Sequence, residues 1–342
     1  MTTDDDLTRE NRRERRRGRV LRVVTTVAVV GLAATVVKLA FFAPPGVGHW
    51  KDAEGRATYA RAYAAALADM PAPTRTLDIP TRFGTVRALE WAAPEGAPST
   101  PVVLLPGRAA GAPMWSENMG ELLGHRTLYA LDAVGDSGFS TQSVPLASYD
   151  DQAEWVAEAI TGLGLTRVHT VGHSFGGATA AVHALRHPEQ VASVSLLEPT
   201  FVIARPPLSL FLWSALIQLP GPQSWEDYAL AKIGGTTVEE VRESSPVGDM
   251  IAAGAEHYTS RLPVPRTLTD DEWRAMPEGL RVDLGGRSDL SGGAKGANRI
   301  RALRPDAVVT LWPEATHSLP MQEHAALGPE LVRFWDGRDT AR

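Results

Sequence analysis

The stretch that decides the fold runs from Val168 to Gly177 and reads Val-His-Thr-Val-Gly-His-Ser-Phe-Gly-Gly. Its first four residues have the length of a buried strand, and the Ala-rich segment after it favours a helix. Ser174 therefore stands on a tight turn between a strand and a helix, where the flanking glycines let neighbouring backbone approach closely. At a helix N-terminus, the free N–H groups and the helix dipole stabilise developing negative charge. This pattern predicts Ser174 as a nucleophile, on a turn formed with Gly172, His173 and Gly176.

Outside this stretch, short apolar runs alternate with segments of helical length. The runs are expected to be strands at 86–91, 101–105, 127–131, 168–171, 191–197, 280–285 and 307–312. Helices are expected at 57–68, 112–123, 149–163, 176–186, 298–303 and 321–335. Such alternation predicts an α/β fold with a mainly parallel sheet and helices on both of its faces.

One long gap interrupts the alternation. No convincing strand lies in 199–279, so this segment is expected to be an inserted helical domain. Residues 208–217 give it an apolar, aromatic helix. That helix is suited to cover a pocket, although the same side chains are also suited simply to pack the insertion onto the core.

The N-terminal segment has the pattern of a membrane anchor. A basic tail, residues 1–22, precedes a largely apolar run at 23–43 in which Lys38 is the one charged residue. About 20 residues suffice to cross a bilayer core of ~30 Å, and the upstream arginines favour a cytoplasmic N-terminus. We expect a single-pass membrane protein whose remaining residues lie outside the cytoplasm. Two alternatives stay open: cleavage near Ala43 with secretion, and a buried core helix.

The expected organisation follows from these features. Its parts are the tail 1–22, the transmembrane signal-anchor 23–43, a linker and helix 44–74, the core in two parts, 75–198 and 280–342, and the helical cap 199–279. The absence of Cys from the 342 residues excludes thiolate chemistry and disulfides, and the net charge of -6 gives little attraction for nucleic acid. Oligomeric state is left open by the sequence.

Several segments together resemble the α/β-hydrolase superfamily, in particular its cap-bearing esterase-like members, over residues 75–335. Besides the turn at Ser174, they are Leu104-Leu105-Pro106-Gly107, the stretch from Leu131 to Ser140, Leu197-Glu198-Pro199, the stretch from Gly285 to Asp289, and the stretch from Ala315 to Pro320. The resemblance implies an α/β-hydrolase fold with a helical cap.

The same resemblance implies the partners of Ser174. His317, after the last strand, takes the place of the catalytic base, and imidazole suits that role because its pKa lies near neutrality. Asp289 is the preferred acid for orienting His317, with Glu198 as the alternative; Asp289 is also suited to cap a helix. The backbone N–H groups of Phe175 and Arg108 take the place of the oxyanion hole. The Arg108 side chain is expected either at the surface or near an acidic group of the substrate.

These residues predict a serine hydrolase that cleaves an ester or related acyl bond of a small, apolar substrate through an acyl-enzyme. Neither a metal nor an organic cofactor is expected. Two alternatives stay open: a membrane-anchored binding or receptor protein without turnover, and a non-esterase use of the triad by a lyase, perhydrolase or carbon–carbon hydrolase. Asp283, inside an expected buried strand, has no explanation in the sequence.

Overall fold

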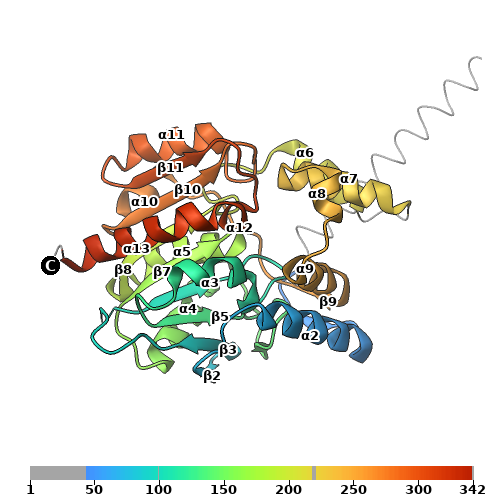
Figure 1. Cartoon of the computed structure of the whole chain (residues 1–342). Helices are drawn as coiled ribbons and strands as arrows, with labels where there is room; N and C mark the ends of the chain where they lie inside the picture. The colour runs from blue at the N-terminus through green and yellow to red at the C-terminus, as the bar shows by residue number, and fades with distance from the viewer. Residues whose placement is uncertain (1–43, 99, 218–220, 341–342) are drawn as a thin grey trace, which may run out of the picture.

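The computed structural model describes residues 44–98, 100–217 and 221–340. At its centre lies a nine-stranded sheet with the order β11-β10-β8-β7-β4-β5-β3-β2, and β6 pairs with β3 (Figure 1). The strands are β2 (Arg75–Thr81), β3 (Gly84–Trp91), β4 (Val102–Leu105), β5 (Leu128–Leu131), β6 (Thr141–Gln142), β7 (Val168–His173), β8 (Val191–Leu197), β10 (Leu280–Gly285) and β11 (Val308–Trp312).

All seven strand runs expected from the sequence are strands of this sheet. The six strands from β5 to β11 in the sheet order are parallel, whereas β3 runs antiparallel to β5, β2 and β6. The sheet is therefore mixed rather than purely parallel. β2 was not predicted, because its side chains are mostly exposed and Pro80 interrupts it, so it has no apolar run.

Helices cover both faces of the sheet, as the alternation predicted. Side chains alternate along β4: Val103 and Leu105 join the core beneath α4 (Asp151–Gly162), α5 (Phe175–Arg186) and α11 (Gly293–Leu303). Val102 and Leu104 join the opposite core. That second core is covered by α2 (Ala53–Ala68), α3 (Ser116–Leu122) and α13 (His324–Thr340). Three short helices lie in connecting segments: η1 (Ala112–Trp115), η2 (Pro188–Gln190) and α12 (Leu319–Gln322).

The long gap between β8 and β10 is filled mainly by helices. They are α6 (Leu208–Ile217), α7 (Gln223–Gly234), α8 (Val238–Arg242), α9 (Pro246–His257) and α10 (Asp270–Ala275). Local signals set their ends: α7 ends at Gly235, which has a φ of 73°, and α8 begins with a capping box between Thr237 and Glu240. In Figure 1, α6, α7 and α8 project to one side of the sheet.

The insertion also contains one short strand that the sequence analysis did not expect. β9 (Tyr258–Thr259) follows α9 directly and pairs antiparallel with β1 (His49–Trp50), near the start of the described chain. The ring of Trp50 lies 5.0 Å from that of Tyr258. The segment before α2 is thereby fixed to the insertion.

Asp283 now has a structural explanation. Its carboxylate accepts two hydrogen bonds of 2.7 Å from the buried guanidinium of Arg281, and the indole N–H of Trp312 donates a third at 3.0 Å. Arg281 also pairs with Glu330 of α13 at 2.6 Å. The buried charges are thus compensated by one another, as a charge inside a sheet requires.

Within the described ranges, no helix is both long enough and apolar enough to cross a membrane. The signal-anchor expected at residues 23–43 lies outside the described residues, so it stays a prediction.

Candidate active site

The turn between β7 and α5 has the strained geometry that its sequence predicted. Ser174 adopts a φ of 55°, a left-handed conformation that costs energy in a non-glycine residue. A Cβ at Gly172 would lie 2.2 Å from the carbonyl oxygen of Gly176, and one at Gly176 would lie 2.3 Å from that of Leu105. Only glycine fits at either position, so the two glycines allow the turn that presents the Ser174 hydroxyl.

His317 connects this hydroxyl to a carboxylate. Its Nε2 lies 2.8 Å from the Ser174 Oγ, and its Nδ1 lies 3.1 Å from an oxygen of Glu198. The loop carrying His317 follows β11, and the backbone N–H of His317 donates to the carbonyl of Gly234 at the end of α7. A hydroxyl, an imidazole and a carboxylate from three distant segments therefore form one hydrogen-bonded chain.

Glu198 is completely buried at the end of β8, and its φ of 47° is also left-handed. Its Oε1 accepts a hydrogen bond of 2.6 Å from the backbone N–H of Gly285. Its Oε2 accepts from the hydroxyls of Ser288 at 2.6 Å and Ser291 at 3.4 Å. With His317, these donors hold both carboxylate oxygens in one orientation.

The preferred acid of the sequence analysis, Asp289, does not occupy this position. Its side chain is exposed, and among the described residues the partner of the His317 Nδ1 is Glu198, the alternative. Asp289 does not cap the next helix either, since the N-cap of α11 is Gly292. The loop after β10 instead contributes Ser288 and Ser291, which hydrogen-bond to Glu198.

The loop after β4 passes close to Ser174. A Cβ at Gly107 would lie 3.3 Å from the Cβ of Ser174, so backbone at 107–108 passes directly beside it. Arg108 and Phe175 both line the same cavity as Ser174. This is where the sequence analysis expected the two N–H donors of an oxyanion hole.

Asp136 holds this loop, a feature that the sequence analysis did not anticipate. Its buried carboxylate accepts a hydrogen bond from the backbone N–H of Ala109 at 3.1 Å and forms an ion pair of 3.1 Å with the Arg108 Nε. Ala109 has a φ of 56°. The guanidinium of Arg108 also stacks over the ring of Phe175, 5.1 Å from its centroid. The Arg108 side chain is therefore half-exposed but already engaged.

Backbone strain is concentrated at this site. Among the described residues, four that are not glycine have a positive φ, namely Ala109, Ser174, Glu198 and Phe201. Three of them line the cavity at the nucleophile, and the fourth is the partner of His317. Strain of this kind persists where the surrounding structure enforces it, which is typical of functional sites.

Two further side chains contact Ser174 and His317. The hydroxyl of Thr200 lies 3.0 Å from the Ser174 Oγ, and the sequence offered no signal for it. The Nε2 of His173 donates to the backbone carbonyl of His317 at 2.8 Å. Burial, followed by the nearby His317, lowers the pKa of His173 to about 3, so this ring stays neutral at neutral pH. It therefore adds no positive charge beside His317.

Ser174 and His317 line a cavity of about 580 Å³ with a mostly apolar wall. The core contributes Met114, Phe175 and Met321 to its wall, and the insertion contributes Leu210, Leu230, Ile233, Ile251 and Val264. Its volume and lining fit an apolar small molecule.

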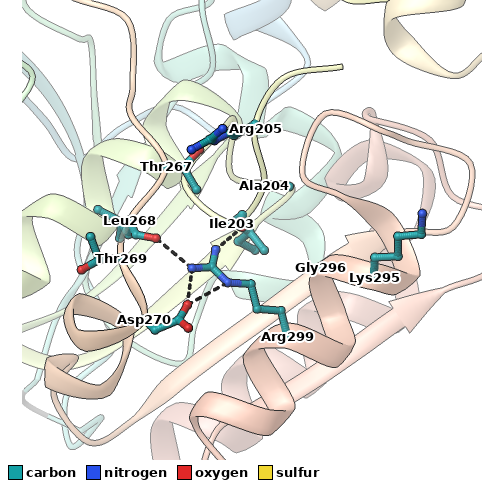
Figure 2. A pocket seen from close by; sticks show the side chains of 10 residues that line it. All are labelled: Ile203, Ala204, Arg205, Thr267, Leu268, Thr269, Asp270, Lys295, Gly296 and Arg299. Atoms are coloured by element: carbon teal, nitrogen blue, oxygen red, sulfur yellow. Dashed lines mark hydrogen bonds and ion pairs between the residues drawn. The ribbon is translucent and has the colours of Figure 1, made fainter. Parts of the chain in front are cut away.

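A second cavity of about 500 Å³ lies between α11 and the two ends of the insertion (Figure 2). Its central side chain, Arg299, donates to the backbone carbonyls of Ile203 and Leu268 and pairs with Asp270. These bonds attach both ends of the insertion to α11. Its lining contains none of the Ser174, His317 and Glu198 side chains.

Comparisons with known proteins agree with this architecture. Residues 100–234 match the family described as alpha/beta hydrolase fold. The chain is 25% identical over 294 residues to an uncharacterized carboxylesterase, nap, of Bacillus subtilis. The aligned residues cover 81% of this chain and 92% of that protein. It is 24% identical to carboxylesterase YbfK of the same organism, over 81% of this chain and 93% of that one.

Solved structures share the fold. The structure of naproxen esterase from B. subtilis superposes with a TM-score of 0.74 at 23% identity, covering 83% of this chain and 99% of that one. A membrane phospholipase A superposes with a TM-score of 0.61 at 20% identity, covering 93% and 98%. The family match over residues 100–234, the two carboxylesterase relatives and these structures together support an α/β-hydrolase fold and a hydrolase of the esterase type.

Proposed function

We propose that this protein hydrolyses carboxylic esters with Ser174 as nucleophile, His317 as general base and Glu198 as the acid that orients His317. The observation that carries the proposal is the pair of hydrogen bonds at His317, 2.8 Å to the Ser174 Oγ and 3.1 Å to the Glu198 carboxylate. In this arrangement the base can accept a proton from the hydroxyl, while the carboxylate fixes the tautomer and stabilises the imidazolium.

The reaction follows from these positions. The Ser174 Oγ attacks the ester carbonyl carbon as its proton passes to the Nε2 of His317, and the carbonyl oxygen becomes an oxyanion. We assign the N–H groups of Phe175 and Arg108 to that oxyanion. The tetrahedral intermediate then collapses, and the departing alcohol takes the proton from His317. A water molecule, deprotonated by His317, attacks the acyl-enzyme and releases the carboxylic acid and the free serine.

The cavity favours a substrate with an apolar acyl or alcohol group. Its wall is mostly aliphatic and aromatic, and the insertion contributes much of it. In this reading, residues 199–279 form a cap that selects the substrate, and the two core parts, 75–198 and 280–342, carry the chemistry. Residues 23–43 would hold the enzyme in a membrane, with the catalytic domain outside the cytoplasm.

An active-site probe tests the assignment of the nucleophile. A fluorophosphonate transfers its phosphonyl group to an activated serine, so we expect labelling of the wild-type chain and none of Ser174→Ala. Ser244→Ala, which removes an exposed serine of the insertion, should label like the wild type. Absence of labelling in a folded wild-type chain would refute the enzyme and favour the non-catalytic binding protein.

A further inference from the structure

The two helices α6 and α7 expose apolar side chains that a helix of a soluble protein normally buries. Leu208 and Leu212 of α6 are 76% and 60% exposed, and Trp225 and Tyr228 of α7 are about half exposed. We call these four residues the cap patch. Apart from two serines, α6 is entirely apolar, yet only Leu210 and Ala215 are buried. A helix that is apolar on all sides is usually covered by protein or lipid.

The cap patch belongs to the same helices that line the catalytic cavity. Leu210 and Ser214 of α6 and Leu230 and Ile233 of α7 face the cavity that contains Ser174. The two helices also contact each other, with the rings of Trp213 and Tyr228 5.5 Å apart. Whatever covers the outer side of α6 and α7 therefore lies beside the cavity.

The start of the described chain is fixed to this insertion. The backbone N–H of Lys51 donates to the carbonyl of His257 at the end of α9, and Trp50 pairs with Tyr258 in β9. Pro44 and His49 are only five positions apart, a span of at most about 20 Å when fully extended. An anchor that ends at residue 43 would consequently hold the insertion close to the bilayer surface.

We propose that the cap patch rests on the surface of a phospholipid bilayer beside the anchor, and that the cavity takes its ester from that surface. This inference rests on the proposed hydrolase function and on the proposed anchor. Tryptophan and tyrosine suit the headgroup region, because each has an apolar body and a polar group. The neighbouring α8 carries Glu239 and Glu240, so a zwitterionic surface is favoured over an anionic one.

A single spin label measures the contact directly. The chain has no cysteine, so Leu212→Cys introduces a unique thiol for a nitroxide in the full-length protein. The quantity to compare is the ratio of the nitroxide's accessibility to oxygen to its accessibility to a water-soluble nickel complex. In phosphatidylcholine vesicles, we expect this ratio to be at least 5-fold higher for the label at position 212 than for a control label. The control is Val308→Cys, an exposed position at the amino end of β11, the strand end opposite to the one that leads to His317.

Three outcomes would overturn the docking. They are equal accessibility of the two labels to the nickel complex, dipolar broadening that shows a second copy on the patch, and failure of the full-length chain to float with the vesicles in a density gradient. The last outcome would also remove the anchor.

An activity measurement separates the docking from the chemistry. Leu208 and Leu212 lie outside the cavity lining, so the double variant Leu208→Asp, Leu212→Asp should hydrolyse p-nitrophenyl acetate within 2-fold of the wild-type rate. Its hydrolysis of p-nitrophenyl palmitate embedded in phosphatidylcholine vesicles should fall at least 10-fold. Equal effects on the two esters, or none, would contradict the proposal. A wild-type chain that hydrolyses neither ester would refute the hydrolase function, while the spin label would still decide the docking.

Discussion

The loop after β8 and the loop after β10 follow neighbouring parallel strands, and each carries a carboxylate at the same edge of the sheet. Glu198, the first residue beyond β8, turns inward with a φ of 47° and reaches His317. Asp289, four residues beyond β10, points into solvent. Gly285, the last residue of β10, and Ser288 of the second loop instead donate hydrogen bonds to the Glu198 carboxylate. A carboxylate after the right strand is thus insufficient, because its neighbours must also hold it against the histidine.

The comparison is tested most strongly by removing each negative charge in turn. Glu198→Gln should lower kcat/KM for a soluble ester by about 10³–10⁴, because a neutral amide no longer holds the reactive tautomer of His317 or stabilises its imidazolium. Asp289→Asn serves as the matched control and should stay within 3-fold of the wild type. Steady-state kinetics with both purified variants would show the reverse ranking if Asp289 were the acid.

Asp136, in the loop after β5, is a third carboxylate at this edge of the sheet. Asp136→Asn keeps an acceptor for one backbone N–H but removes the ion pair with Arg108, so the loop that carries the Arg108 N–H should loosen. We expect kcat to fall about 10-fold with KM nearly unchanged, equivalent to about 1.4 kcal/mol at the transition state. A change confined to KM would indicate that Asp136 acts on substrate binding instead.

The smallest effect is expected from the hydroxyls that support Glu198. Ser288→Ala removes a donor at 2.6 Å from a buried carboxylate and should lower kcat about 5-fold, as expected for part of one charged hydrogen bond. Ser291→Ala removes a donor at 3.4 Å and should cost less than 2-fold. Thermal unfolding of both variants should be recorded alongside the kinetics. If the two variants lose activity equally, the loop after β10 does not support the acid in the way that these distances indicate.

Much of the core was predictable because its signals are local. The strand, turn and helix around Ser174 are adjacent in sequence, and their glycines report a close backbone approach that any fold with this turn requires. β4 and β5, for example, are buried along their whole length, and such strands must be largely apolar. β2 escaped prediction for the converse reason, since an edge strand with exposed side chains carries little hydrophobic pattern.

The residues that sequence reasoning missed act over long distances. Thr200 contacts Ser174 across 26 positions, and Asp136 holds a loop 27 positions earlier in the chain. Asp283 lacked an explanation until Arg281, Trp312 and Glu330 were placed around it. Hydrogen-bond partners of this kind leave no periodic trace in the sequence, so their roles emerge only from the packed structure.

The sequence by itself predicted the fold class and singled out Ser174 and His317, because the serine turn lies in contiguous residues and the histidine loop follows the last strand, as the family resemblance implies. Only the tertiary structure shows which carboxylate contacts His317. Both Glu198 and Asp289 follow suitable strands, and the choice between them depends on φ angles and on hydrogen bonds donated by a separate loop. Those interactions form only when β8 and β10 lie side by side, because orientation of a buried side chain is set by its neighbours in space rather than in sequence.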